Sequence, residues 1–463
     1  MRALKMLRVP SIEENIGIRV YITESRGLGG IIKRAPEDFI VEEVLVDGSM
    51  ASVRLEDNRL SSPTEHGRYL ICVLVKRGWD ALLAIDEIAK ALSISSDRIG
   101  FAGIKDADAL TAQHISIGGV PLNRLANINI EGLLIKPLGY SNEKISPEKL
   151  FGNRFRITVR SIKIGEKTAK RRIEKINEEI AEFGGIPNFF GHQRFGTVRP
   201  ITHIVGKHIV MGNFKDAILT FLTYQSPYEG ARIREIRREL CETMDFDSAL
   251  RRFPKSLIYE RLILTHLSKS PNDYLGALQK VPLNLRKLFV QAYQSYLFNR
   301  FLSERIRRKI PIKEALEGDY AIELDENGLP RKKFLKVEAS NVKAINDELK
   351  RGRVALGIPL VGPRQPLSEG LQGEIEREIL EEEDVSQEDF KGAGMIKVNV
   401  SGGLRLALAK IIGLKVDILD DIETPGRKAA TFNFMLLRGA YATILLREYI
   451  KPTTDKQLIK CGF

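Results

Sequence analysis

The chain of 463 residues predicts an α/β (α+β) fold that is interrupted by a large, mainly helical insertion. Three observations predict it. A continuously apolar strand, Tyr69–Val75, is followed directly by an amphipathic helix. The stretch 200–423 is helical in pattern and rich in charge. Strand character then returns in Ala430–Thr443, which reads as a strand, a Gly turn and the start of a helix.

The length also favours more than one domain, because a single core stops growing well below this size. We expect the core domain to begin with residues 1–199. The insertion then occupies 200–424, and 425–463 rejoins the core.

The first strand of the core follows a turn at Pro36. In this strand Phe39, Val41 and Glu43 share one face by the two-residue period. A carboxylate in line with an aromatic ring suits the wall of a functional site, and an edge strand with Glu43 in water is the alternative.

The helix after Tyr69–Val75 is predicted to start at Asp80, whose side chain suits an N-cap. Its apolar positions recur at helical spacing. They are Leu82, Ile85, Ile88, Ala89 and Leu92.

A glycine-containing loop follows, and it carries Lys105 and Asp106 between short apolar runs. Gly100 and Gly103 suggest a tight turn at a sheet edge, in backbone shapes that other residues avoid. A carboxylate held there serves as a nucleophile or proton-transfer group when a cation keeps it ionised. By itself, a Lys-Asp dipeptide in a loop is usually a solvated surface pair.

The next strand alternates an apolar face with a basic one. Phe155, Ile157 and Val159 are interleaved with Arg154, Arg156, Thr158 and Arg160. The basic face fits either a sheet surface that meets RNA or ordinary surface arginines.

An amphipathic helix at Thr168–Phe183 should end at Gly184, a C-cap residue. The loop after it, Gly185–Gly196, contains Asn188, Phe190 and Arg194 with two further aromatic residues. So much aromatic surface in a loop either plugs onto a core or offers a base a stacking platform. Within the insertion, the clearest helix is Asn284–Arg307, whose apolar stripe favours core packing.

Composition bounds the function. Lys and Arg total 72 against 60 Asp and Glu, and a net charge of +12 fits either a polyanionic partner or a lysine-rich surface. Three scattered cysteines argue against disulfides or structural zinc and fit a reducing cytoplasm. We expect no signal peptide and no membrane span. Phosphate-loop, dinucleotide and His-Glu-x-x-His motifs are missing, so we expect chemistry without nucleotide, nicotinamide or metal.

Several separated segments together resemble the TruD family of transfer-RNA pseudouridine synthases. They are Lys33-x-x-Pro36-Glu37-Asp38-Phe39 with Glu43, Gly100–Asp106 with Ala109, Thr111 and Gln113, Pro187–Gly191 with Gln193–Gly196, Gln294–Asn299, and Arg438–Thr443. The resemblance covers nearly the whole chain, and the order of the segments makes it specific.

The resemblance implies a pseudouridine-synthase catalytic core built round a mixed sheet, with a family-specific inserted domain. It implies isomerisation of uridine, typically uridine 13 of tRNA, without a cofactor. Asp106 matches the catalytic aspartate. The positions that surround the flipped uridine are matched by Lys33, Phe39, Glu43, Asn188 and Phe190.

The residues themselves agree with this chemistry and add details. An unstacked base calls for an aromatic face such as Phe190, and Asn188 suits a uracil edge. Lys33 or Arg194 could pair with Asp106 or with a phosphate. Lys105 lies on the same loop as Asp106. Whether Asp106 attacks uracil, attacks ribose or removes a proton stays open.

Two other functions are consistent with parts of the sequence. One is a noncatalytic RNA-binding protein that keeps the fold and the basic surface. The other is a hydrolase that uses Asp106 and Glu43 as a carboxylate pair. The sequence leaves the oligomeric state open, and a monomer is our expectation.

Overall fold

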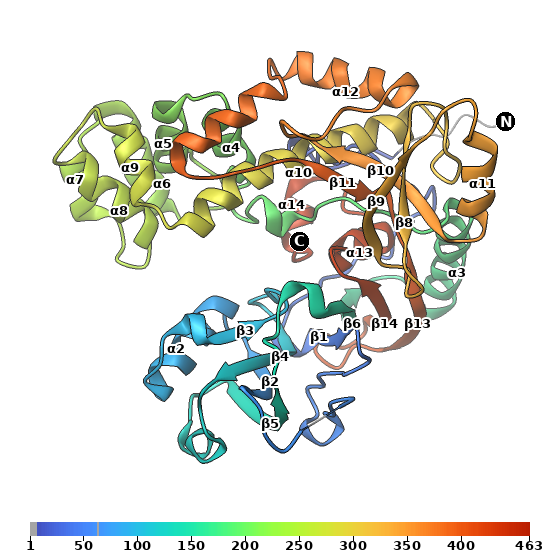
Figure 1. Cartoon of the computed structure of the whole chain (residues 1–463), viewed down its shortest axis with the longest axis horizontal. Coiled ribbons are helices and arrows are strands. Elements are labelled where there is room, and N and C mark those ends of the chain that lie inside the picture. The colour runs from blue at the N-terminus through green and yellow to red at the C-terminus, as the bar shows by residue number, and fades with distance from the viewer. Residues whose placement is uncertain (1–6, 63) are drawn as a thin grey trace. The chain divides into compact units, whose positions relative to one another are not determined.

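Two compact units make up the protein in the computed structural model, which describes residues 7–62 and 64–463 (Figure 1). The sheet unit comprises Ser25–Ile186, Ala409–Pro452 and Gln457–Phe463. The helical unit comprises the residues up to Glu24, Pro187–Leu408 and Thr453–Lys456. The chain thus leaves the sheet unit after Ile186 and re-enters it at Ala409, both earlier than the changes that the sequence suggests after 199 and after 424.

The sheet unit is built on a mixed eight-stranded sheet, in the order β13-β14-β6-β1-β4-β2-β5 with β3 added against β4. The strands are β1 (Phe39–Leu45), β2 (Tyr69–Arg77), β3 (Ile99–Phe101), β4 (Leu110–Gly118), β5 (Leu133–Ser141), β6 (Leu150–Ile162), β13 (Ile411–Asp420) and β14 (Lys428–Leu437). The β1–β4 pair is parallel and the other pairs are antiparallel. The mixed α/β core is therefore confirmed.

Strand register fixes which side chains of this sheet share a face, because residues directly opposite one another point the same way. Two rows cross β1, β6 and β14 on the buried face, namely Phe39–Ile157–Phe432 and Val41–Phe155–Phe434. Helix α13 (Ala442–Ile450) packs there, and the Tyr449 and Phe432 rings meet edge to face with centroids 4.9 Å apart.

Helix α2 (Ala81–Leu92) covers β2 and β4 through a shared apolar cluster. The Asp80 carboxylate accepts hydrogen bonds from the backbone N–H groups of Leu82 and Leu83, as an N-cap should. Leu82 itself is exposed, contrary to its predicted place on the apolar face, because the first turn buries Ala81 and Ala84 instead.

Helix α3 (Glu166–Phe183) begins two residues before its predicted start, with Glu166 in the first turn, where the helix dipole favours a carboxylate. It ends at Gly184, whose φ of 95° is the left-handed conformation of a C-cap. The predicted cap is confirmed.

The helical unit surrounds a long central helix, α10 (Leu283–Arg307), which starts one residue before the prediction. Its other helices are α1 (Ser11–Asn15), α4 (Thr202–Val210), α5 (Phe214–Thr223), α6 (Ala231–Thr243), α7 (Phe246–Arg252), α8 (Ile258–Leu267), α9 (Tyr274–Lys280), α11 (Val342–Lys350) and α12 (Gly370–Glu382). A four-stranded sheet in the order β11-β10-β8-β9 is packed with them, formed by β8 (Tyr320–Leu324), β9 (Pro330–Lys336), β10 (Val354–Leu360) and β11 (Gly403–Leu406). Short elements at the crossings between units are β7 (Ile186–Pro187), β12 (Leu408–Ala409) and α14 (Asp455–Lys460).

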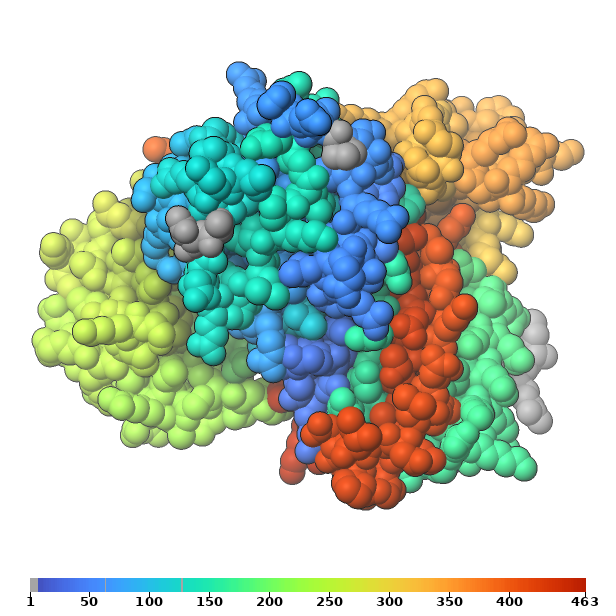
Figure 2. Space-filling view, turned by 90° about the horizontal axis from the view of Figure 1, so that it is seen from below, coloured from blue at the N-terminus to red at the C-terminus, as the bar shows by residue number. Residues whose placement is uncertain are grey.

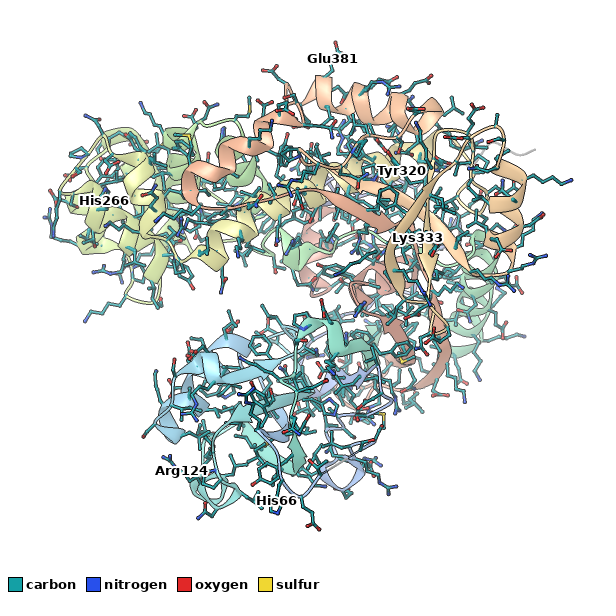
Figure 3. The ribbon with its side chains drawn as sticks, in the orientation of Figure 1. His66, Arg124, His266, Tyr320, Lys333 and Glu381 are labelled. Carbon is teal, nitrogen blue, oxygen red and sulfur yellow. The ribbon has the colours of Figure 1, made fainter. Side chains whose placement is uncertain are left out.

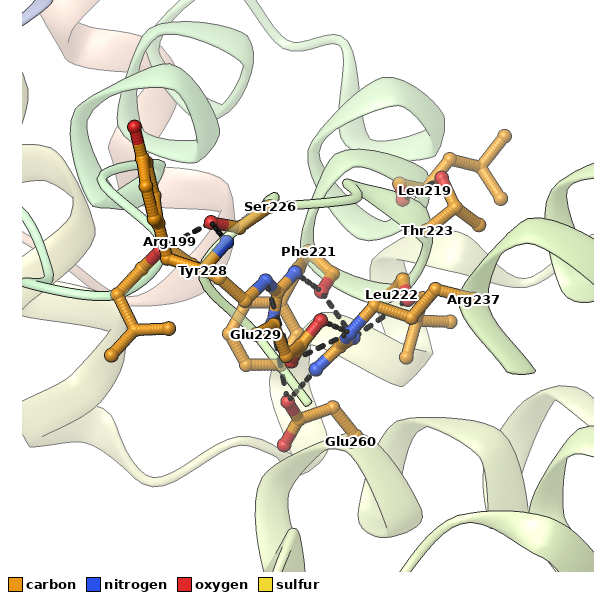
Figure 4. A network of polar contacts seen from close by, with 11 residues as sticks. Arg199, Leu219, Phe221, Leu222, Thr223, Ser226, Tyr228, Glu229, Arg237 and Glu260 are labelled. Atoms are coloured by element: carbon orange, nitrogen blue, oxygen red, sulfur yellow. Dashed lines mark hydrogen bonds and ion pairs between the residues drawn. The ribbon is translucent and has the colours of Figure 1, made fainter. Parts of the chain in front are cut away.

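A buried arginine ties helices of this unit together (Figure 4). The Arg237 guanidinium of α6 donates to carboxylate oxygens of Glu229 and Glu260, each 3.0 Å away, and to the Leu222 carbonyl at 2.7 Å. Its side chain is 1% exposed. Arg237 thereby links the end of α5 to α6 and α8.

Strand β9 is exposed at every residue and carries a row of cations that includes Lys333, labelled in Figure 3. Most of these cations are paired, since Lys333 lies 2.8 Å from Glu323 and Lys336 bonds Glu369. A charged edge strand that begins with proline resists pairing with other chains.

Among the described residues, no helix has the length and apolar content needed to cross a membrane.

Candidate functional site

The loop that carries Asp106 joins β3 to β4 and leaves the middle of the sheet, because β4 lies between β1 and β2. This differs from the predicted sheet edge. Neither Gly100 nor Gly103 has a positive φ. Gly100 instead permits close packing, since a Cβ there would lie 2.5 Å from the Ser116 hydroxyl oxygen and 2.6 Å from the Ile145 carbonyl oxygen.

The Asp106 carboxylate is paired with Lys33, whose Nζ lies 3.0 Å from Oδ1. The Asp106 side chain remains 28% exposed, whereas that of Lys33 is 11% exposed. The Lys33 ammonium also lies 4.5 Å from the centre of the buried Phe39 ring, within cation–π range. The structure thus brings three predicted site residues together and leaves the carboxylate accessible.

Lys76 supports this loop and was missed by the sequence reasoning. It is fully buried at the end of β2 and donates to the backbone carbonyl of Asp106 and to that of Trp79. Burial lowers the pKa of Lys76 to about 8, although the nearby Asp106 carboxylate acts in the opposite direction. The sequence did contain a signal for this role, because Lys76 directly follows the uninterrupted apolar strand Tyr69–Val75.

Glu43 and Lys105 are bonded to each other inside the sheet unit. Lys105 Nζ lies 2.6 Å from Glu43 Oε2, and the two side chains are 3% and 0% exposed. Glu43 Oε1 accepts from the backbone N–H of His114 at 2.9 Å and lies 3.2 Å from the His114 Nδ1. Burial alone would raise the pKa of Glu43, but the Lys105 charge and the His114 contacts outweigh it and the pKa is lowered.

Two polar side chains of β4 lie on the face that carries Val41, next to these groups. Thr111 is directly opposite Val41 on one side and Lys76 on the other. The Thr111 hydroxyl and both amide atoms of Gln113 are buried and have no hydrogen-bond partner among the described residues.

Asn188 belongs to the helical unit, where both ends of its amide are engaged. Its Nδ2 donates to the Leu406 carbonyl at 3.0 Å, and its Oδ1 accepts from Arg405 Nη2 at 2.7 Å. Arg405 was not predicted, and its only sequence signal is a cation two residues after the pair Gly402-Gly403.

Phe190, in the same unit, is buried at 9% exposure. The Arg405 guanidinium lies 3.9 Å from its ring centre, and the Phe298 ring meets it edge to face at 5.6 Å. Asn299 of α10 fixes the backbone here, accepting from the Phe190 N–H at 2.8 Å and donating to its carbonyl at 3.1 Å. The neighbouring Phe189 and Phe195 are fully buried, so the loop plugs onto a core.

Arg194 lies near this ring as well. Its guanidinium is 5.7 Å from the Phe190 ring centre, and it donates to the Ser295 hydroxyl at 3.3 Å and the Gln291 side chain at 3.2 Å. The predicted site residues therefore form two clusters, one on each unit. We call them the Asp106 cluster (Lys33, Phe39, Glu43, Lys105, Asp106) and the Phe190 cluster (Asn188, Phe190, Arg194).

Within the described ranges, no group of three or more His, Cys, Asp or Glu side chains is arranged to hold a metal ion.

Comparison with known proteins matches this chain almost from end to end. The family described as tRNA pseudouridine synthase D (TruD) matches residues 15–449. A probable tRNA pseudouridine synthase D of Methanococcoides burtonii is 39% identical over 447 residues, which cover 96% of this chain and 98% of the relative. One from Methanopyrus kandleri is 41% identical over 385 residues, covering 83% of this chain and 86% of the relative.

A solved structure agrees with the fold. The crystal structure of the putative TruD from Methanosarcina mazei is similar with a TM-score of 0.79 and 38% sequence identity, covering 97% of this chain and 99% of that one. Similarity of sequence and of fold over nearly the whole length confirms the resemblance seen in the motifs. The chain belongs to the TruD family of tRNA pseudouridine synthases and, as a pseudouridine synthase, is an isomerase.

Proposed function

We propose that this protein converts uridine 13 of tRNA to pseudouridine, with Asp106 as the nucleophile. The reaction breaks the glycosidic bond between the ribose carbon and uracil nitrogen and rejoins the same uracil through its C5 carbon. The C5 hydrogen leaves as a proton and the freed uracil nitrogen gains one, so composition and oxidation state are unchanged. A single ionised carboxylate that reaches the flipped nucleotide meets the chemical need.

The observation that carries this proposal is the Asp106–Lys33 pair. The Lys33 ammonium holds the Asp106 carboxylate from 3.0 Å, while 28% exposure of the Asp106 side chain leaves it open to substrate. Lys76 bonds the backbone of the same residue, so the loop presents the carboxylate from a fixed position.

The other members of the Asp106 cluster have different roles in this proposal. Phe39 forms an apolar floor beneath the Lys33 ammonium. Glu43 and Lys105 are buried and bonded to each other, so we assign them to positioning the loop rather than to touching the uridine.

The Phe190 cluster contributes RNA contacts from the helical unit. The Phe190 ring already has the Arg405 guanidinium against it, and Asn188 orients that guanidinium. Arg194 adds a second cation for a phosphate. In domain terms, the sheet unit is the catalytic domain, the inserted domain lies within the helical unit, and we place the enzyme in the cytoplasm as a monomer.

The decisive experiment is Asp106→Asn, assayed with tRNA that carries tritium at uracil C5. We expect tritium release to fall below detection while tRNA affinity stays within about twofold, since the lost group is one among many RNA contacts. Asp108→Asn is the matched control: Asp108 is exposed on the same loop, and this variant should keep wild-type release. An active Asp106→Asn enzyme would refute the assignment.

The hydrolase alternative is disfavoured by the environment of Glu43. Both of its carboxylate oxygens are occupied, by Lys105 and by His114, so it offers no second acid or base beside Asp106. A hydrolase would release free uracil, and chromatography of the products distinguishes the two reactions. A purely RNA-binding protein would release no tritium at all.

A further inference from the structure

The sheet unit carries an open groove on the sheet face opposite to the face of Phe39. The groove has a volume of about 920 Å³. Its floor is formed by β1, β6, β13 and β14, and the segment around residues 50–59 forms one wall. In Figure 2 blue atoms of the first part of the chain lie beside the orange-red atoms of its last part, to which β13 and β14 belong.

Strand register places arginines on the floor of this groove. Arg154 is directly opposite Glu42 and Met435, and Arg156 is directly opposite Ile40 and Asn433. The side chains of both arginines therefore lie on the sheet face opposite to the one that carries the buried aromatic residues. The predicted basic face is confirmed at Arg154 and Arg156, which are exposed, whereas Arg160 is mostly buried and paired with two carboxylates.

The charges of the groove are strongly unbalanced. Its lining contains five cations, Arg54, Arg59, Arg154, Arg156 and Lys415, against the two carboxylates Glu42 and Asp57. Glu42 is already occupied, because its Oε1 accepts from the Ser52 hydroxyl and the Val53 N–H.

The five cations have no ion-pair partner among the described residues. Elsewhere on the same unit Arg77, Lys149 and Arg160 each pair with a carboxylate. Most cations of the basic strand β9 of the helical unit are likewise paired with neighbouring carboxylates. Unpaired cations that converge on one groove repel one another, and a polyanion relieves that repulsion.

We propose that this groove binds the phosphodiester backbone of the tRNA substrate, at a part of the RNA other than the flipped uridine. The inference rests on the proposed function, because it takes tRNA to be the substrate. Guanidinium groups match phosphate oxygens in geometry, and displaced counterions supply the free energy. The groove lies on the other side of the sheet from Phe39, so it anchors the RNA without reading the target base.

The test compares two double variants that remove the same charge. Arg156→Ala with Lys415→Ala removes two exposed cations of the groove. Arg124→Ala with Lys163→Ala is the control, because both are exposed on the same unit and outside the groove (Arg124 is labelled in Figure 3). Affinity for full-length tRNA is measured by filter binding between 50 and 300 mM salt, together with kcat and KM for tritium release.

We expect the groove variant to lose about tenfold in affinity at 100 mM salt. The slope of log K against log salt should become shallower by roughly 1.4 to 1.8, the value for two lost phosphate contacts. KM should rise while kcat at saturating tRNA stays unchanged.

Equal affinities and equal salt slopes in the two double variants would overturn the groove assignment. A fall in kcat with unchanged affinity would also overturn it, since that pattern indicates a disturbed catalytic loop. If the wild-type protein bound tRNA without isomerising uridine, the proposed function would fail, and the affinities alone would still decide whether the groove binds RNA.

Discussion

At the scale of single residues, the site depends on charges that are buried and compensated. Lys105 and Glu43 are the clearest case, with an ammonium and a carboxylate 2.6 Å apart and almost no exposure. Two such charges need one another, because either alone would remain in a poorly solvating interior.

Replacing Lys105 with Met should therefore destabilise the sheet unit by about 3–5 kcal/mol, since it leaves the Glu43 charge buried without its partner. The free energy of unfolding, measured in urea, checks this. Adding Glu43→Gln should restore much of the loss. Lys149→Met is the control, because the Lys149–Glu143 pair is exposed and should contribute little. Similar losses in the two single variants would contradict the argument.

Lys76 gives the site a pH-dependent component. In the folded chain its pKa is about 8 against an ordinary value of 10.5, so between these pH values the unfolded chain holds a proton that the folded chain has lost. The free energy of unfolding then rises with pH across this window, and the cost of burying the charge is fully present only below about pH 8.

From pH 7.5 to 10.5, we expect the free energy of unfolding of the wild type to rise by about 3 kcal/mol relative to that of Lys76→Met. Subtracting the variant removes the contribution of other titrating groups, which both proteins share. Urea unfolding at several pH values makes the measurement. Parallel curves for the two proteins would show that Lys76 does not titrate in this window.

At the scale of secondary-structure elements, the helical unit relies on Arg237 to join three segments. Arg237→Met should lower the free energy of unfolding by about 3–5 kcal/mol, because the carboxylates of Glu229 and Glu260 would lose their buried partner. Arg238→Met is the matched control: Arg238 is adjacent, 58% exposed and paired only with Glu235 at 3.5 Å. If Arg238→Met lowered the free energy of unfolding by the same amount, the loss would come from helix propensity and not from the buried network.

Elements with a regular hydrophobic period could be predicted from the sequence. Strands β1 and β2, helix α2 and the Gly184 cap lie where the pattern places them, because local periodicity and capping decide them. The backbone of the Asp106 loop could not be predicted from the sequence. Gly100 is needed there because Ser116 and Ile145 pack too close for a side chain, and not because its φ is positive.

At the scale of the whole molecule, tertiary contacts decided features that the sequence analysis placed elsewhere or missed. The chain crosses between units at Ile186, where composition does not change, and the aromatic loop beyond it packs against α10 through Asn299. In the candidate site, Asp106 and Phe39 could be proposed from motifs and period. Lys76 and Arg405 could not, because their roles come from contacts with residues distant in sequence.

The placement of β14 between β6 and β13 has a consequence for synthesis of the protein on the ribosome. Until residues 428–437 emerge, β6 is an open edge whose backbone N–H and C=O groups lack the partners that β14 supplies. A nascent chain must therefore shield this edge while more than two hundred residues of the other unit are made. A message that stops short of β14 would yield an aggregating fragment even though every residue of the Asp106 cluster had been translated.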